Sequence, residues 1–280
     1  MTPLNGVRCD LGEGAFWHPE RGEVFWFDIT GRKLHSLAQS WDFDEMVSAA
    51  GWIDRDRLLI ASEIRLFVFD LATGAASSLC ALEADRLHTR SNDGRADLQG
   101  GFWIGTMGKG AEPKEGAIYR WHAGRLRKLY SGITIPNAIC FAPDGSSACF
   151  TDTVTQKVMR VALDAEGWPK GHPELHLDLR GTDLNPDGAV IDASGVMWLA
   201  QWGASRVAAY APDGTFLRAV SVPALHTSCP AFGGVGLTDL YCTTARQGLT
   251  NPGPLEGATF VAPGIATGQR EHQIKLSQDA

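Results

Sequence analysis

Four oxygen-bearing side chains recur at a similar distance before a bulky residue of a short apolar run. They are Glu13, Asn92, Asn137 and Asp187, and each precedes such a residue by 11 or 13 positions. Carboxylate and amide oxygens, without Cys or His, are the ligands that hard divalent cations prefer, Ca²⁺ above all. The spacing therefore predicts a metal site, provided that the fold brings these four positions together.

The alternative reading of these residues is that they are turn residues. Asn-Asp-Gly at 92–94 and Pro-Asp-Gly at 186–188 are ordinary turn tripeptides. Asp144 and Asp213 lie in similar tripeptides and are interpreted as turns. The shared offset, and not the residue type, distinguishes the four candidates.

Other catalytic chemistries lack their motifs. The sequence has no G-x-S-x-G and no H-E-x-x-H, and GTMGKG at 105–110 lacks the Ser or Thr that follows a P-loop lysine. The six cysteines are scattered without a C-x-x-C pair, which favours buried free thiols. His88, His226 and Trp202 stay open as substrate contacts, and Trp202 is equally compatible with core packing.

The elements that would position these residues are short strands. Runs of four to eight apolar or alternating residues, such as EVFWFDI, GFWIGTM and VMWLAQW, are bounded by Gly, Pro, Asn or Asp. Six such units recur with a spacing of 34 to 48 residues; their central residues are Trp26, Ile60, Trp103, Phe150, Trp198 and Tyr241. This spacing is typical of propeller blades and predicts an all-β, six-bladed β-propeller that forms one domain over residues 1–280.

The propeller topology explains how distant residues can meet. The innermost strands of all blades converge on a central channel, so residues near the start of each of these strands lie close together. A β-sandwich is the rival architecture, but it would not produce so regular a repeat. Residues near 5–8 or the tail at 272–278 are expected to complete the last blade.

Composition excludes several classes of protein. The 280 residues carry a formal charge of −7, and the pI near 5.6 argues against a nucleic-acid-binding protein. No run approaches the roughly 20 apolar residues that cross a bilayer, and the N-terminus has no signal-peptide pattern. We expect a cytoplasmic protein with no membrane partner, and a monomer is favoured.

The chain resembles the SMP-30/gluconolactonase/luciferin-regenerating-enzyme family, also called the regucalcin family. The resemblance covers nearly the whole chain, and its order and spacing are specific. Its segments are LGEGAFWHPERGEVFWFDI at 11–29, RSNDGRAD at 90–97, FWIGTM at 102–107, IPNAICFAPDG at 135–145, NPDGAVIDASGVMWLAQW at 185–202 and PAFGGVGLTDLYCTTA at 230–245.

This resemblance implies a six-bladed propeller and a divalent-metal-dependent hydrolase that acts on sugar lactones. Glu13, Asn137 and Asp187 match the family's metal ligands. Arg90 and Asn92 match positions that contact the substrate, and Asn92 is expected to reach the ion directly or through water. Ca²⁺ is favoured by the all-oxygen ligands, while Zn²⁺, Mn²⁺, Mg²⁺ and Fe²⁺ stay open.

The sequence departs from the family pattern in two places. Asn137 is followed by Ala138, where the family often has Gly. Gly108, Lys109 and Gly110 occupy a stretch in which some members carry an acidic residue for substrate hydroxyls, and here Glu112 and Glu115 come only later. These departures bear on substrate preference and leave the predicted ligands in place.

The expected reaction is hydrolysis of a five- or six-carbon aldonolactone to the aldonic acid, which is carboxylic-ester hydrolysis. The metal would polarise the lactone carbonyl, Asp187 would activate water, and Arg90 would orient the substrate. Two alternatives stay open. The same metal site would serve an organophosphate or non-sugar lactone hydrolase, or the protein is a calcium-binding propeller without enzymatic activity.

Overall fold

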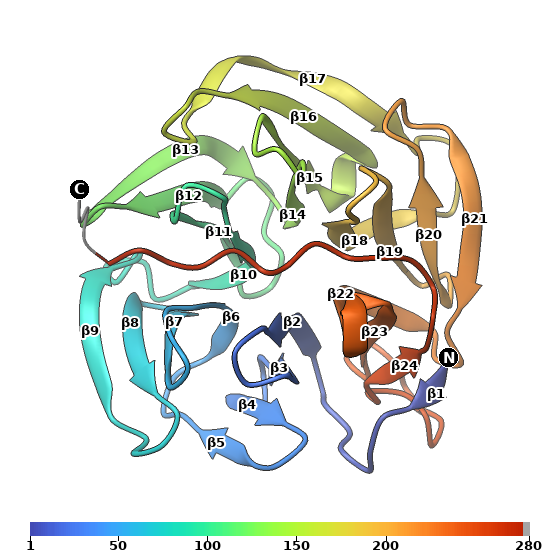
Figure 1. Ribbon diagram of the computed structural model, residues 1–280, viewed down its shortest axis with the longest axis horizontal. Helices are drawn as coiled ribbons and strands as arrows, with labels where there is room; N and C mark the ends of the chain where they lie inside the picture. The colour runs from blue at the N-terminus through green and yellow to red at the C-terminus, as the bar shows by residue number, and fades with distance from the viewer. Residues whose placement is uncertain (277–280) are drawn as a thin grey trace.

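The computed structural model describes residues 1–276 and is built almost entirely of β-strands (Figure 1). Four of its sheets each contain four consecutive antiparallel strands. The first has β2 (Gly12–His18), β3 (Glu23–Asp28), β4 (Lys33–Ser36) and β5 (Ser40–Asp42), and the second has β6 (Val47–Trp52), β7 (Arg57–Ser62), β8 (Arg65–Asp70) and β9 (Ala76–Ala81). The third has β10 (Thr89–Ala96), β11 (Phe102–Gly108), β12 (Gly116–His122) and β13 (Arg125–Ile133), and the fourth has β14 (Pro136–Phe141), β15 (Ser147–Asp152), β16 (Lys157–Leu163) and β17 (Pro169–Asp178).

The remaining strands form one eight-stranded sheet. Its members are β18 (Asn185–Ile191), β19 (Met197–Trp202), β20 (Arg206–Tyr210), β21 (Phe216–Ser221), β22 (His226–Gly233), β23 (Asp239–Ala245), β24 (Phe260–Ala262) and β1 (Thr2–Pro3). The β18–β21 group and the β22–β24 group are joined at one residue pair, Trp202 with His226. Two short 3₁₀ helices are also present, η1 (Thr153–Thr155) and η2 (Val235–Leu237).

The sheets stand side by side around a common centre (Figure 1). The strands nearest the centre are β2, β6, β10, β14, β18 and β22; each contacts the next along the chain, and β22 contacts β2. This arrangement is propeller-like, and the all-β prediction is confirmed. The runs predicted as strands, such as those at 23–29, 102–107 and 197–202, are β3, β11 and β19.

The repeated aromatic residues are explained by packing between neighbouring sheets. Trp103 on β11 packs edge-on against Phe141 of the fourth sheet, with ring centroids 5.6 Å apart. Trp198 on β19 makes the same kind of contact with Phe232 on β22 at 5.7 Å, between the two strand groups of the eight-stranded sheet. Both tryptophans are buried, so each contributes a large apolar area that holds adjacent sheets or strand groups together.

Each central strand that carries a predicted site residue also contains a β-bulge near its beginning. The register shifts after Glu13 on β2, after Ser91 on β10, after Asn137 on β14 and after Pro186 on β18. A bulge adds one residue and turns the local side chains away from regular alternation. The predicted site residues therefore lie where a bulge changes the local direction of the strand backbone.

The C-terminal segment passes across the middle of the molecule (red in Figure 1). Gln269 Nε2 donates to the Ile191 carbonyl at 2.8 Å, and the Ile274 amide donates to the Trp52 carbonyl at 2.8 Å. These carbonyls lie at the ends of β18 and β6, whereas the predicted site residues lie where the central strands begin. The segment therefore covers the opposite end of the central channel.

Of the two segments expected to complete the last sheet, the N-terminal one does so. β1 pairs with β24 at the edge of the eight-stranded sheet, so the strand lies at residues 2–3, just before the expected region near residues 5–8. Residues 272–276 form no strand; instead they follow the channel end, because Ile274 is buried in the apolar core between the second and third sheets. Residues 277 and 278 of the expected segment, and 279–280 of the predicted domain, lie outside the described residues.

No helix among residues 1–276 is both long and apolar enough to span a membrane.

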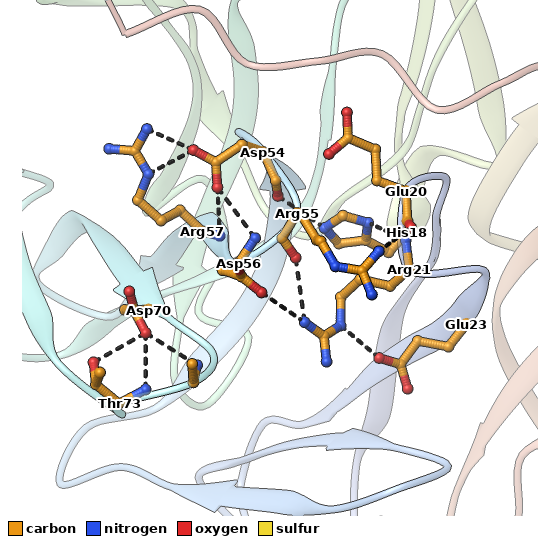
Figure 2. Close-up of polar contacts among 11 residues, drawn as sticks. His18, Glu20, Arg21, Glu23, Asp54, Arg55, Asp56, Arg57, Asp70 and Thr73 are labelled. Carbon is orange, nitrogen blue, oxygen red and sulfur yellow. Dashed lines mark hydrogen bonds and ion pairs between the residues drawn. The ribbon is translucent and has the colours of Figure 1, made fainter.

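A polar network ties the first sheet to the second (Figure 2). The Arg21 amide donates to His18 Nδ1 at 3.3 Å, so the ring's proton is on Nε2, which donates to the Asp54 carbonyl at 3.1 Å. Arg21 also pairs with Asp56 at 3.0 Å, and Arg55 donates to the Glu20 carbonyl at 2.8 Å. Hydrogen bonds and an ion pair therefore connect the β2–β3 turn to the β6–β7 turn.

We predict that Gly14→Ala destabilises the protein strongly. Gly14 has a φ of 56°, and a Cβ there would collide with the Ser48 carbonyl oxygen of β6. Gly22→Ala is the matched control, because Gly22 has a φ of 66° but no atom near the new Cβ. Urea unfolding should show a loss of about 1 kcal/mol for the control and at least about 2 kcal/mol more for Gly14→Ala. Equal losses would mean that backbone strain alone matters at Gly14.

We also predict that His18 makes stability depend on pH. Burial lowers the pKa of His18 from 6.5 to about 4, so the unfolded chain binds this proton at a pH where the folded protein does not. The stability from neutral His18 is complete above pH 6.5 and is lost as the pH falls towards 4. Between pH 7 and 5 the wild type should lose on the order of 1–2 kcal/mol more than His18→Gln in urea unfolding. His172→Gln, at an exposed ring, is the control and should behave like the wild type.

Candidate functional site

A cavity of about 520 Å³ lies at the end of the channel where the central strands begin. We call it the central cavity. Its walls are formed by Leu11, Glu13, Arg90, Asn92, Met107, Lys109, Gly110, Ala111, Ile135, Asn137, Thr153, Val154, Asn185, Asp187, Trp202 and Gln247. All five residues proposed from the sequence line it, and each is at most 6% exposed.

The four recurring residues occupy two adjacent positions of the bulge and not one shared position. Glu13 and Asn137 are the last paired residues before the register shift. Asn92 and Asp187 follow the last paired residue, which is Ser91 on β10 and Pro186 on β18. The reference residues differ in place as well: Trp26 and Phe150 stand one residue before the partner of the last paired residue, and Trp103 and Trp198 stand three before it.

A chain of hydrogen bonds crosses three sheets along the floor of the cavity. Arg90 Nη1 donates to Asn92 Oδ1 at 2.7 Å, and Asn92 Nδ2 donates to Asn137 Oδ1 at 3.0 Å. Asn137 Nδ2 donates to Thr153 Oγ1 at 2.9 Å, and Thr153 Oγ1 donates to the Pro186 carbonyl at 2.7 Å. The chain orients both amides, and it leaves one lone pair of Asn137 Oδ1 for a further partner.

Three carboxyl groups are buried around this chain. Burial, with the nearby Asp93 carboxylate, raises the pKa of Glu13 to about 8. Burial, followed by the Glu13 and Asp93 charges, raises the pKa of Asp187 well above its usual range. Burial also raises the pKa of Asp93 to about 6, although its Oδ2 accepts a 2.7 Å bond from the Ile139 amide.

Positive charge at this site is scarce. Burial lowers the pKa of the Arg90 guanidinium to about 10, while Glu13 and Asp187 act in the opposite direction. Among the described residues, no Lys, Arg or His forms an ion pair with Glu13 or Asp187. Buried carboxylates without paired charges are unfavourable, so the site is suited to a bound cation.

The donor set fits a hard divalent ion. No group of three or more His, Cys, Asp or Glu side chains in residues 1–276 is arranged to hold a metal. An ion here would instead use the two carboxylates of Glu13 and Asp187 together with the amide oxygen of Asn137. Oxygen-only ligation of this kind is typical of Ca²⁺ and also accepts smaller divalent ions.

Sequence reasoning missed several residues of the central cavity. Leu11, Ile135 and Asn185 each stand two positions before a predicted ligand, as Arg90 stands two before Asn92. Side chains at i and i+2 of a strand point to the same face, so a period of two would have found them. Thr153 had no such signal, because it enters the cavity from the short helix η1.

The structure distinguishes the three residues whose contact with a substrate the sequence left undecided. Trp202 lines the central cavity, and His226 stacks on it with ring centroids 4.2 Å apart. His88 is exposed; it contacts Glu115 at 3.3 Å and is not among the residues that line the cavity.

We predict that Thr153→Val weakens metal binding about ten-fold, because Asn137 Nδ2 loses its acceptor and the amide is no longer oriented. Calorimetric titration with Ca²⁺ measures this effect. Thr155→Val is the matched control on the same short helix: Thr155 is exposed and its hydroxyl donates to the Asp152 carbonyl, away from the cavity. Equal affinities for the two variants would show that Thr153 does not position Asn137.

Comparison with known proteins identifies a family model and several relatives that this chain matches. The family model described as SMP-30/Gluconolactonase/LRE-like region matches residues 11–246. The chain is 36% identical to the L-arabinolactonase of Azospirillum brasilense over 93% of this chain and 91% of that one. It is 32% identical to the pentonolactonase XacC of Haloferax volcanii over 97% of each chain.

A solved structure is similar along the whole chain. It is described as a calcium-binding protein, regucalcin, from Agrobacterium tumefaciens. The TM-score is 0.94 with 39% sequence identity, and the match covers 97% of this chain and 96% of that one.

Proposed function

The chain belongs to the SMP-30/gluconolactonase/LRE-like family, and from this premise we propose that it is a divalent-metal-dependent sugar lactonase. Its substrate would be an aldonolactone of five or six carbons, and the product the aldonic acid. The names of the two lactonase relatives support a hydrolase of cyclic esters. The observation that carries the metal dependence is the group of buried carboxyls around Arg90, which lacks enough positive charge of its own.

The same proposal includes the complete architecture. The eight-stranded sheet would be two four-stranded blades, β18–β21 and β22–β24 with β1, whose strands pair with each other at Trp202 and His226 alone among the described residues. With the other four sheets this makes a six-bladed propeller that forms one domain over residues 1–280.

The ion would be held by Glu13, Asn137 and Asp187. Ca²⁺ is favoured because all three ligands are oxygens, and the calcium-binding description of the similar Agrobacterium structure supports it. Zn²⁺, Mn²⁺, Mg²⁺ and Fe²⁺ are the other candidates. Asn92 donates to Asn137 Oδ1 and so would orient this ligand towards the ion.

In the proposed mechanism, the bound ion supplies the Lewis acid that polarises the lactone carbonyl. Arg90 lies against the same cavity, and its guanidinium would orient the substrate oxygens, since Asn92 Oδ1 and the Ser91 carbonyl hold it in place at 2.7 and 2.9 Å. A carboxylate oxygen of Asp187 would accept the proton of the attacking water. The apolar residues of the wall exclude bulk water, which strengthens these electrostatic contacts.

A second candidate is calcium binding without turnover. The description of the Agrobacterium structure as a calcium-binding protein favours it. The presence of Arg90 argues for the lactonase, because a guanidinium has no role as a cation ligand and is suited to a substrate oxygen.

The proposal is tested by chelating the protein and adding back single cations while a pH indicator follows hydrolysis of pentono- and hexonolactones. Activity should vanish with the chelator and return with one or more divalent ions. A protein that binds Ca²⁺ by calorimetry but hydrolyses none of these lactones with any ion would favour the second candidate. A paraoxon-like ester in the same panel distinguishes organophosphate hydrolysis.

We predict that Asp187→Asn lowers kcat by at least about 10²-fold, because an amide of the same shape cannot take the proton from water. Asp144→Asn is the control, since Asp144 is an exposed turn residue whose carboxylate accepts bonds from Ser146. Full turnover by the metal-loaded Asp187→Asn variant would refute the assigned role.

A further inference from the structure

The central cavity is lined by two kinds of residue. Glu13, Arg90, Asn92, Asn137 and Asp187 supply its buried polar groups, for which the mechanism above accounts. Leu11, Ile135 and Trp202, from different parts of the chain, are among its apolar residues. Trp202 is the aromatic residue among those that line the cavity, and the mechanism above gives it no role.

The backbone of Trp202 is held on both sides. Trp202 ends β19, pairs with Asn185 of β18, and also pairs with His226 of β22. Asn185 Nδ2 donates to the Trp202 carbonyl at 3.4 Å. This residue therefore stands at the junction of two strand groups, where its position depends on several backbone contacts.

One face of the Trp202 indole is covered by His226. The two rings are 4.2 Å apart and inclined by only 18°, which is a stacked arrangement. His226 Nδ1 lies 3.0 Å from the Gln247 carbonyl, and because a carbonyl only accepts, Nδ1 carries the hydrogen. The imidazole is thus fixed in orientation and supports one face of the indole by stacking on it.

The rest of the indole is available to a ligand. Trp202 stays half-buried and lines the cavity although His226 covers one of its faces. Gln247, whose backbone holds His226, also lines the cavity. Trp202 and Gln247 are therefore connected through His226 and both line the cavity.

Lys109 is less suited to recognise a neutral sugar. It also lines the cavity, but its Nζ donates to the Leu87 carbonyl at 2.8 Å and forms an ion pair with Glu63. The lysine charge is already engaged by these two groups. Among the described residues that line the cavity, the indole of Trp202 has no such partner, and its stacking on His226 holds it in place.

A sugar lactone ring is chemically complementary to the indole of Trp202. Its hydroxyls project around the ring, while the hydrogens on carbon make one ring face apolar and slightly positive. The face of an indole is negative, and contacts with it contribute about 0.5–1.5 kcal/mol beyond the area that they bury.

We propose that Trp202, supported by His226, is the platform on which the carbon–hydrogen face of the substrate ring stacks, and that Gln247 binds a ring hydroxyl. This inference rests on the proposed lactonase function and assigns the residues that orient its substrate. The lactone carbonyl would then face the Arg90 guanidinium and the ion that Glu13 and Asp187 would hold, with the ring flat on the indole. Lactones with a hydroxyl or bulky group on the stacked face are poor substrates.

The kinetic test compares Trp202→Leu, which keeps an apolar side chain but removes the aromatic face, with Trp202→Phe, which keeps a ring. Trp202→Leu should raise KM about five- to ten-fold with kcat within about two-fold, and Trp202→Phe should recover most of the loss. His226→Ala keeps the indole and removes its support, so it should raise KM to a smaller extent. If the Trp202 variants do not fold, the KM of His226→Ala tests the proposal instead, and an unchanged KM would contradict it.

The matched control is Trp168→Leu. Trp168 is also half-buried and contacts charged groups, Arg120 and Arg127, but it lies at the outer β16–β17 turn. It should have the KM of the wild type. Equal kinetics for Trp202→Leu and Trp168→Leu would overturn the proposal.

A binding measurement separates this inference from the lactonase proposal. Saturation-transfer NMR with 1,5-anhydroglucitol, a hexose ring without a hydrolysable carbonyl, should show transfer from aromatic protons to the ring C–H protons. The transfer should be absent in Trp202→Leu and present in Trp168→Leu. If the wild type hydrolyses no lactone but shows this pattern, the stacking site stands and the enzymatic function fails. Absence of transfer in the wild type would overturn the stacking site.

Discussion

The structure is organised around the burial of several carboxyl groups at one point. Glu13, Asp93 and Asp187 come from three different sheets, and each has its pKa raised mainly by burial. Arg95 acts on Asp93, so Arg90 is the cation whose charge reaches both Glu13 and Asp187, and one guanidinium cannot balance these two carboxylates. Such an arrangement is unfavourable by itself, so the surrounding fold must hold it in place and a bound cation would relieve it.

The rest of the fold supplies this restraint. Bulges at the start of the central strands turn the polar residues inward, while aromatic contacts such as Trp103 with Phe141 hold neighbouring sheets together farther out. The C-terminal segment covers the other end of the channel, where Glu271 pairs with Arg95. Water and substrate therefore reach the carboxyls from one end, at the central cavity.

The hydrogen-bond chain from Arg90 to the Pro186 carbonyl connects the parts of the site to one another. Each amide in it donates in the same direction, so a change at Thr153 alters the orientation of Asn137. Trp202, stacked on His226, lines the same cavity and adds an aromatic surface to it. The cavity thus combines charged groups with a surface suited to the flat apolar face of a ring.

The sequence by itself determined the all-β class and the repeated strand unit, and its spacing indicated four of the polar residues that meet in the cavity, because alternation, turn residues and spacing are local properties of the chain. The fifth, Arg90, was indicated only by the family resemblance. The sequence did not determine that Glu13 and Asn137 occupy one bulge position and Asn92 and Asp187 the next. Nor did it reveal Thr153, the stacking of His226 on Trp202, or the pairing of β1 with β24. These features depend on contacts between residues far apart in the chain, and only the packing of one sheet against the next decides which of those residues meet.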